Sequence, residues 1–162
     1  MKYVLLAALF AANCYAEDVQ ITGNVQSKCV ITTDTAGVYG NPTADKLSTL
    51  SADGGVTPVV RYDVSLAGAY KARITTPTSF STSPSLNDTV TWTGDTSVKT
   101  VSDAAMSTYE TSKVTFGSTT EYDLLVAGST WFKSSSTATY GYGKALPGGS
   151  YRAVVQAECI AK

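Results

Sequence analysis

Apolar and polar residues alternate along several stretches of this chain. The clearest stretch is residues 60–66, where every second side chain is apolar: Val60, Tyr62, Val64 and Leu66. Residues 70–74 repeat the pattern after Ala67-Gly68, with Tyr70, Ala72 and Ile74 in the apolar positions. Because successive side chains of a strand point to opposite faces, this alternation predicts two half-buried strands. We expect them to form an antiparallel hairpin in which Tyr62 and Ile74 face the core.

Shorter stretches predict further strands at residues 28–33, 46–50, 90–92, 97–101, 113–116, 121–126 and 150–160. Between them we expect a turn at Gly94-Asp95, a crossing loop over 76–86, a helical turn over 103–106 and a loop-like Ser/Thr/Gly/Tyr-rich run over 134–143. No long stretch combines Leu, Glu and Lys, whereas Thr, Ser, Val, Tyr and Gly are abundant, which is β-sheet composition. About seven to nine short strands separated by turns predict an all-β, immunoglobulin-like sandwich.

The first 16 residues have the features of a secretory signal peptide. They contain one lysine, an apolar run from Tyr3 to Ala12, and a small residue, Ala16, at the expected cleavage point. The apolar run is too short for a membrane span, so we expect export without a stable span. Cys14 offers an alternative, in which a lipid-modified cysteine becomes the new N-terminus, but the preceding Asn13 is a poor match to the small residue that such sites need.

Cleavage after Ala16 leaves Cys29 and Cys159 as the two remaining cysteines. Two cysteines in an exported chain most often pair, so we expect a disulfide between them. The loop that it closes covers most of the chain, and the entropy lost by the unfolded state corresponds to roughly 4–5 kcal/mol. The alternative is a pair of free buried thiols.

Residues 17–27 contain a short amphipathic stretch at the mature N-terminus. Val19, Ile21 and Val25 have one parity, and Gly23 falls on the same side. The residues between them are polar, so as a strand the segment has one apolar and one polar face. The first strand of any β-sandwich has this pattern.

Charge and chemistry exclude several function classes. The formal net charge is −1 with no basic block, so we expect no nucleic-acid partner. The chain has no histidine and no Gly-x-Ser-x-Gly motif, and its acidic residues lack calcium-loop spacing. We therefore expect no enzyme activity, no metal and no cofactor, although a carboxylate pair brought together by folding needs no sequence proximity.

Aromatic residues are the candidates for a binding surface. Trp92 lies in an alternating stretch, which predicts a core position. Tyr140 and Tyr142 fall in the loop-like run, and we expect them to be exposed. Carbohydrate stacking or packing between subunits would each explain exposed tyrosines here.

The order Val19-x-Ile21-x-Gly23-x-Val25 followed by Cys29, and the ending from Pro147 to Val155, resemble chaperone–usher fimbrial subunits and the related spore-coat-U-like secreted subunits. The resemblance implies an incomplete immunoglobulin-like sandwich in residues 28–162, with residues 17–27 as a donor strand that completes a neighbouring subunit. It also implies assembly through a periplasmic chaperone and an outer-membrane usher into an extracellular fimbrium serving adhesion or biofilm formation.

In such an assembly the first and last strands of a subunit flank the groove that receives the donated strand. Strands on either side of a one-strand gap lie about 9–10 Å apart, which is beyond the reach of a disulfide. A bond between Cys29 and Cys159 therefore requires the two strands to converge near one end of the groove. The alternative function is a monomeric secreted carbohydrate- or surface-binding module, in which residues 18–26 would pair within their own fold.

Overall fold

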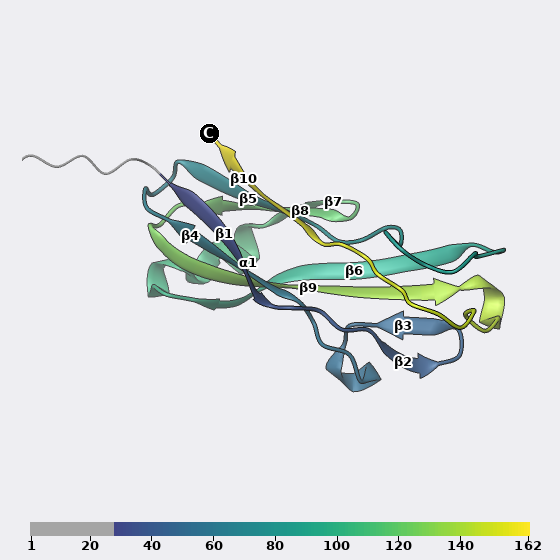
Figure 1. Ribbon diagram of the computed structural model, residues 1–162. Coiled ribbons are helices and arrows are strands. Elements are labelled where there is room, and N and C mark those ends of the chain that lie inside the picture. Colours follow the sequence, from purple (N-terminus) through teal and green to yellow (C-terminus); the bar gives the residue numbers. More distant parts are fainter. Residues whose placement is uncertain (1–27) are drawn as a thin grey trace, which may run out of the picture.

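The computed structural model describes residues 28–162, which form two antiparallel sheets (Figure 1). The prediction of an all-β chain is confirmed. The predicted signal peptide, and the predicted donor residues Val19, Ile21, Gly23 and Val25, lie outside the described residues.

The first sheet has the order β1 (Cys29–Thr35), β4 (Val59–Val64), β9 (Gly128–Tyr140), β3 (Lys46–Ser48) and β2 (Gly40–Thr43), with β6 (Val90–Val101) also paired to β9. The second has the order β10 (Gln156–Ala161), β5 (Tyr70–Thr75), β8 (Thr119–Leu124) and β7 (Val114–Phe116). Short helical turns connect the strands: η1 (Ser51–Asp53), η2 (Ala104–Thr108), α1 (Tyr109–Ser112) and η3 (Gly141–Gly143). The predicted helical turn is thus present, and it extends into α1.

The two sheets share one hydrophobic core. The first sheet contributes Val60, Tyr62, Val64 and Phe132, and the second contributes Ala72, Ile74, Tyr122 and Leu124. Met106 and Tyr109, from η2 and α1, close one side of the core. Tyr62 and Ile74 are fully buried, so the faces predicted for their strands are correct.

The predicted hairpin of residues 60–66 and 70–74 is wrong. β4 pairs with β1 and β9, whereas β5 pairs with β10 and β8. The residues between them, 65–69, carry the chain from one sheet to the other. Alternation fixes which face of a strand is buried but not which strand lies beside it, because a hairpin and a crossing between sheets have the same pattern.

β6 and β9 are longer than the sequence predicts. β6 runs through Gly94-Asp95 without a turn, and β9 runs through the Ser/Thr-rich residues 134–140. Gly94 meets a packing need, because a Cβ there would lie 2.7 Å from the Ser135 carbonyl oxygen and 3.0 Å from the Thr76 side chain. The buried hydroxyls of β9 are satisfied within the fold, as in the 3.3 Å hydrogen bond from Thr96 to Ser134.

The end of the β6–β9 ribbon where Val90 pairs with Tyr140 is covered by irregular segments instead of strands (Figure 1). Phe80, from the crossing segment after β5, packs on two aromatic rings. Its ring centroid lies 4.7 Å from that of Trp92 on β6 and 5.0 Å from that of Tyr151 in the segment before β10. Trp92 is therefore part of a separate aromatic cluster and is only partly buried. No helix within residues 28–162 is long and apolar enough to cross a membrane.

Candidate functional site

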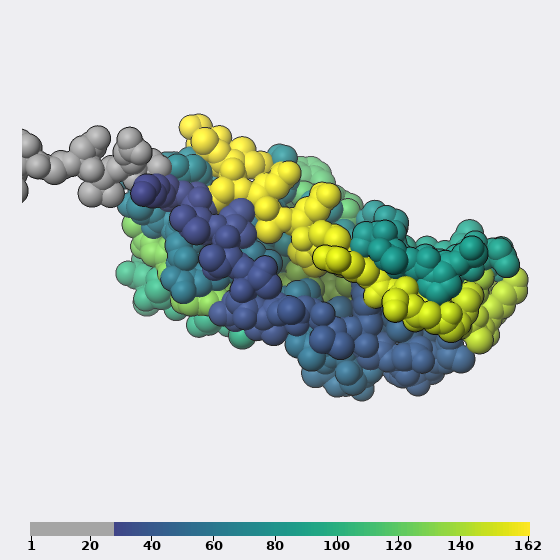
Figure 2. Space-filling model, in the orientation of Figure 1, coloured from purple at the N-terminus to yellow at the C-terminus, as the bar shows by residue number. Residues whose placement is uncertain are grey.

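The candidate site is the strip of surface between β1 and β10. Here we call it the seam, and define it as the space between residues 29–39 on one side and 149–161 on the other. β1 and β10 are the end strands of their sheets, and within the described chain β1 forms a ladder only with β4, and β10 only with β5. Figure 2 shows the purple and yellow bands of these segments running beside each other, with atoms of underlying segments visible between them.

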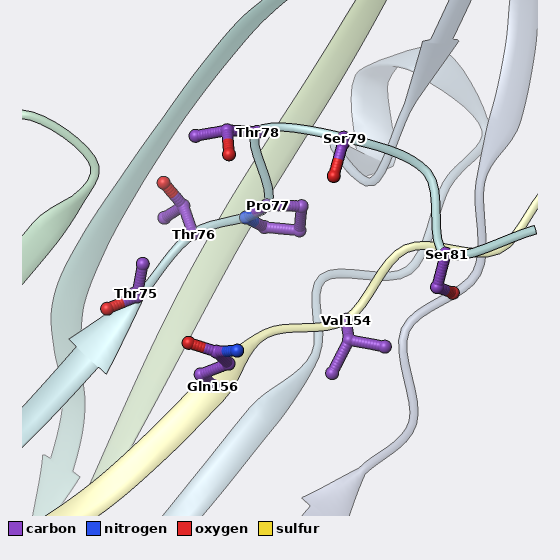
Figure 3. Close-up of a pocket in the computed structure, with 8 residues that line it drawn as sticks. All are labelled: Thr75, Thr76, Pro77, Thr78, Ser79, Ser81, Val154 and Gln156. Carbon is purple, nitrogen blue, oxygen red and sulfur yellow. The ribbon is translucent and has the colours of Figure 1, made fainter.

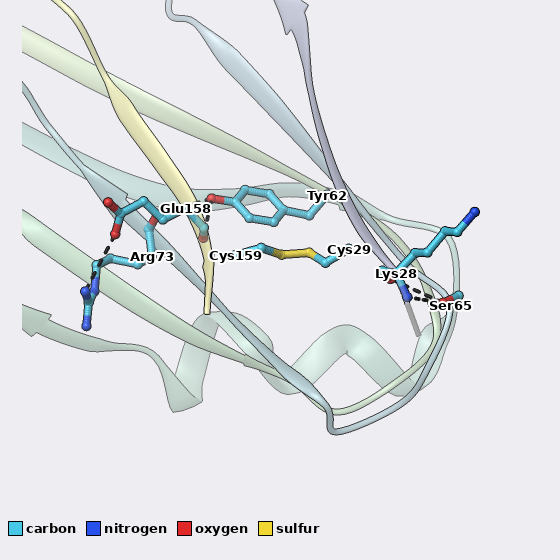
Figure 4. Close-up of a disulfide and its surroundings, with 7 residues drawn as sticks. All are labelled: Lys28, Cys29, Tyr62, Ser65, Arg73, Glu158 and Cys159. Carbon is cyan, nitrogen blue, oxygen red and sulfur yellow. Dashed lines mark hydrogen bonds and ion pairs between the residues drawn. A yellow bond between two sulfur atoms is a disulfide. The ribbon is translucent and has the colours of Figure 1, made fainter. Parts of the chain in front are cut away.

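A disulfide closes one end of the seam. Cys29 begins β1 and Cys159 lies near the end of β10, and their Cα atoms are 6.3 Å apart (Figure 4). A separation of this size leaves no room for an intervening strand, which needs about 9–10 Å. The two strands therefore converge at this closed end and separate towards residues 37–39 and 149–153 (Figure 1).

Lys28, immediately before β1, is hydrogen-bonded on the side of β1 away from the seam. The Lys28 amide donates to Ser65 Oγ at 2.7 Å, and the Ser65 amide donates to the Lys28 carbonyl oxygen at 3.0 Å. In Figure 4, Lys28 and Ser65 lie on the opposite side of β1 from Cys159. Lys28, the one described residue before β1, is thereby joined to the protein beside the turn after β4.

Behind the seam, one buried tyrosine connects the two sheets. The Tyr62 hydroxyl on β4 lies 3.2 Å from the carbonyl oxygens of Arg73 on β5 and Glu158 on β10. Its ring packs edge-to-face on Phe132 with the ring centroids 5.5 Å apart. Burial raises the pKa of the Tyr62 hydroxyl above its ordinary value, so the group remains protonated and donates to these acceptors.

β10 is also held from its outer face. Arg73 on β5 forms ion pairs with Glu121 on β8 at 2.7 Å and with Glu158 on β10 at 3.6 Å. Hydrogen bonds from Arg73 and Lys71 hold the pKa of Glu121 below its usual range. These contacts fix β10 to its own sheet and leave its other edge facing the seam.

The core is incompletely covered along the seam. Ile31 on β1, with Val155 and Ala157 on the other side, packs against the hydrophobic core but is only partly buried. These residues share the parity of Cys29 and Cys159, whose alternation is visible in the sequence. A strand placed between β1 and β10 would cover them and would pair with two backbone edges that have no partner strand within residues 28–162.

One hollow lies where the seam widens, and a second lies outside the seam. One, of about 400 Å³, is lined by Gly37, Val38, Tyr39, Leu47, Gly149, Tyr151, Arg152 and Ala153. It therefore opens between the two sides of the seam. The second, of about 370 Å³, lies on the outer side of the segment that leads into β10. Hydroxyl side chains from residues 75–81 line most of that second hollow (Figure 3).

The two tyrosines predicted to be exposed have opposite environments. Tyr140 is 5% exposed, so the prediction for it is wrong, and its hydroxyl accepts a hydrogen bond from the Asn87 amide at 3.2 Å. Tyr142 is fully exposed at the turn after β9. Tyr140 is the last residue of β9, whose even-numbered side chains from Thr130 onward face inward, whereas Tyr142 lies beyond the end of the strand, in η3.

In residues 28–162, no group of three His, Cys, Asp or Glu side chains is placed to hold a metal ion. The described part of the seam presents backbone edges and aliphatic side chains, which suit it to binding an extended peptide.

Comparisons with family models, with curated proteins and with solved structures found no match for this chain.

Proposed function

We propose that this protein is a structural subunit of an extracellular filament, and that residues 17–27 of one subunit add as a strand to the seam of the next. The observation that carries the proposal is a pair of strand edges at the seam that no strand of residues 28–162 occupies, with Ile31, Val155 and Ala157 partly uncovered between them. An unpaired edge beside apolar side chains is a template for strand addition.

The apolar face of residues 17–27 matches this surface. Val19, Ile21 and Val25 would cover the aliphatic side chains of the seam, and each aliphatic side chain that is fully buried contributes roughly 1.5–3 kcal/mol. Gly23 would lie where the donated backbone must approach the core closely. The polar residues between them would face solvent.

The closed end of the seam sets the direction of the donated strand. Cys29 and Cys159 leave no space for a third strand at the closed end. The donated segment must therefore be inserted from the wide end, and it stays connected to its own subunit through that end. Its N-terminal part then points towards the disulfide, and its C-terminal part leaves near residues 37–39 and 149–153. The donated strand therefore runs in the same direction as β1 and antiparallel to β10.

Insertion of residues 17–27 into the seam of the same molecule is disfavoured. The segment is attached at the closed end, where Lys28 is bonded to Ser65 on the side of β1 away from the seam. To reach its own seam, the chain would have to reverse over the disulfide. The monomeric binding-module alternative, which needs residues 18–26 paired within their own fold, meets this obstacle.

The test uses a synthetic peptide of residues 17–27 and the oxidised chain of residues 28–162, refolded together. We expect saturable binding and a higher melting temperature, because a ligand that binds only the folded state stabilises it. A peptide carrying Ile21→Asp should not bind, since it would bury an unpaired charge, whereas a peptide carrying Thr22→Asp should bind like the parent. Equal behaviour of the two charged peptides, or no binding of the parent peptide, would contradict the proposal.

A further inference from the structure

Large apolar side chains are exposed at both ends of the described molecule. At one end is Tyr142, in the turn after β9. At the other end are Leu66 and Leu125, which are 52% and 54% exposed. Figure 1 shows the turn after β9 at the opposite end of the elongated molecule from the β4–β5 and β8–β9 turns that carry the leucines.

The Tyr142 turn is anchored on both sides. The Gly141 amide donates to the Thr89 carbonyl oxygen at 2.9 Å, and the Lys144 amide donates to the Gly141 carbonyl oxygen at 2.9 Å. Lys144 also forms an ion pair with Asp88. The backbone around Tyr142 is therefore fixed, and the aromatic ring projects from a supported turn.

The two leucine turns are tied to each other. The Gly68 amide, from the β4–β5 turn, donates to the Leu124 carbonyl oxygen at 2.9 Å, and Val64 pairs with Gly128 at the start of β9. Beneath them, the Val126 amide donates to the buried Tyr109 hydroxyl at 2.9 Å. Leu66 and Leu125 thus lie on a supported surface at the same end as Lys28, which is bonded to Ser65 in the first of these turns.

Chain length brings these two ends together, if residues 17–27 are donated as proposed above. Only Gln26 and Ser27 separate Val25 from Lys28, so the Cα atoms of Val25 and Lys28 are at most about 11 Å apart. Val25 is the last apolar residue of the donated strand and would lie at the wide end of the seam of the receiving subunit. Lys28, and the leucine turns beside it, must then lie against that part of the receiving subunit.

We infer that consecutive subunits make a second contact, in which Tyr142 of the receiving subunit packs on Leu66 and Leu125 of the donating subunit. The partner is a second copy of this chain. An aromatic ring packed over two leucines removes apolar surface of both subunits from water. A contact between opposite ends of identical subunits is head-to-tail, so it builds a filament instead of a closed ring. This contact would set the angle between subunits, whereas the donated strand provides the link. The inference rests on the proposed donor-strand function.

The experiment places the photoreactive residue benzoylphenylalanine at position 142 of the full-length exported chain, irradiates assembled material, and maps adducts by mass spectrometry. We expect adducts on residues 65–69 or 125–127 of a neighbouring chain. The same probe at Phe116, which is 69% exposed on the edge strand β7, is the matched control and should give none there. Monomers should give no adduct between these sites, because they lie at opposite ends of one molecule.

Leu125→Asp should lower the adduct yield about tenfold or more, since the contact would bury an unpaired charge. Val114→Asp is the control, because Val114 is exposed on β7, away from both ends. Filaments that form normally but give no adduct between position 142 and the leucine turns would overturn this contact and leave the donor-strand proposal intact. Absence of filaments from the parent chain would overturn the proposed function itself.

Discussion

The Tyr62 hydroxyl on β4 lies 3.2 Å from the carbonyl oxygen of Glu158 on β10, so a side chain of one sheet is hydrogen-bonded to the end strand of the other. This contact lies behind the seam and holds β10 in position from within the core. The Cys29–Cys159 bond holds the same strand at one end, and Arg73 holds it from the outer face. Both end strands are therefore fixed in place, while no strand of residues 28–162 pairs with their facing edges.

Tyr62→Phe removes this hydroxyl and keeps the ring. We expect the free energy of unfolding to fall by about 1–3 kcal/mol, because the carbonyl oxygens of Arg73 and Glu158 lose a buried donor. Urea unfolding at neutral pH measures the change. Tyr142→Phe removes an exposed hydroxyl and should stay within about 0.5 kcal/mol of the parent. If the two variants are equally stable, the hydroxyl of Tyr62 does not stabilise β10.

Ile74→Ala should destabilise the fold by about 2–5 kcal/mol, because Ile74 is fully buried between the sheets and its truncation leaves a cavity. Val114→Ala is the comparison, since Val114 is 48% exposed and should lose much less. Chemical unfolding of both variants under oxidising conditions gives the two values. A loss at position 74 no larger than at position 114 would mean that β5 has the opposite face buried.

The disulfide should make a large contribution to stability. Cys29 and Cys159 are 130 residues apart in sequence, and removal of a native disulfide typically costs about 2–5 kcal/mol. Mass spectrometry of a non-reducing digest should first show the peptide that contains Cys29 joined to the peptide that contains Cys159. The double variant Cys29→Ala/Cys159→Ala should then unfold at a lower urea concentration. Recovery of two free thiols from native material would disprove the bond.

Acid should weaken the outer face of the second sheet. The pKa of Glu121 is lower in the folded protein than in the unfolded chain, mainly because Arg73 donates a hydrogen bond to its carboxylate. Its contribution to stability is therefore present above the unfolded pKa of about 4.3, and is lost as pH falls through the folded pKa. We expect Glu121→Gln to flatten the fall in stability below about pH 4.3. Urea unfolding of the parent and of Glu121→Gln from neutral pH into acid measures the difference, and an equal fall in stability would contradict this role of Glu121.

The sequence predicts which face of a strand is buried better than it predicts which strand lies beside it. The parity of residues 60–66 and 70–74 correctly places Tyr62 and Ile74 in the core. The pairing of the two stretches was wrong, because the information that separates a hairpin from a crossing lies in the sheets on either side. Those sheets depend on contacts between residues far apart in the chain, such as β1 with β4 and β10 with β5.

The largest error in strand prediction was β9, and it also caused the error at Tyr140. Serines 134–136 suggest a loop because clusters of serine are typical of turns and loops. In the fold they lie in the middle of a sheet, where small hydroxyl side chains find partners such as Thr96. Tyr140 and Tyr142 have the same parity, and what separates them is the end of β9 at Tyr140, which a sequence pattern without β9 does not locate. The seam was partly foreseeable, because a bond between Cys29 and Cys159 requires the strands that carry them to converge at one end.

The central claim is that residues 17–27 of one subunit occupy the seam of the next. Its most direct test compares Ile21→Asp with Thr22→Asp in the full-length exported protein, scored by electron microscopy for filaments and by unheated gels for polymer ladders. A one-residue shift moves the charge from the apolar to the polar face of the same strand. We predict that Ile21→Asp abolishes filaments while the domain still folds, and that Thr22→Asp assembles like the parent. Normal filaments from Ile21→Asp would contradict the account.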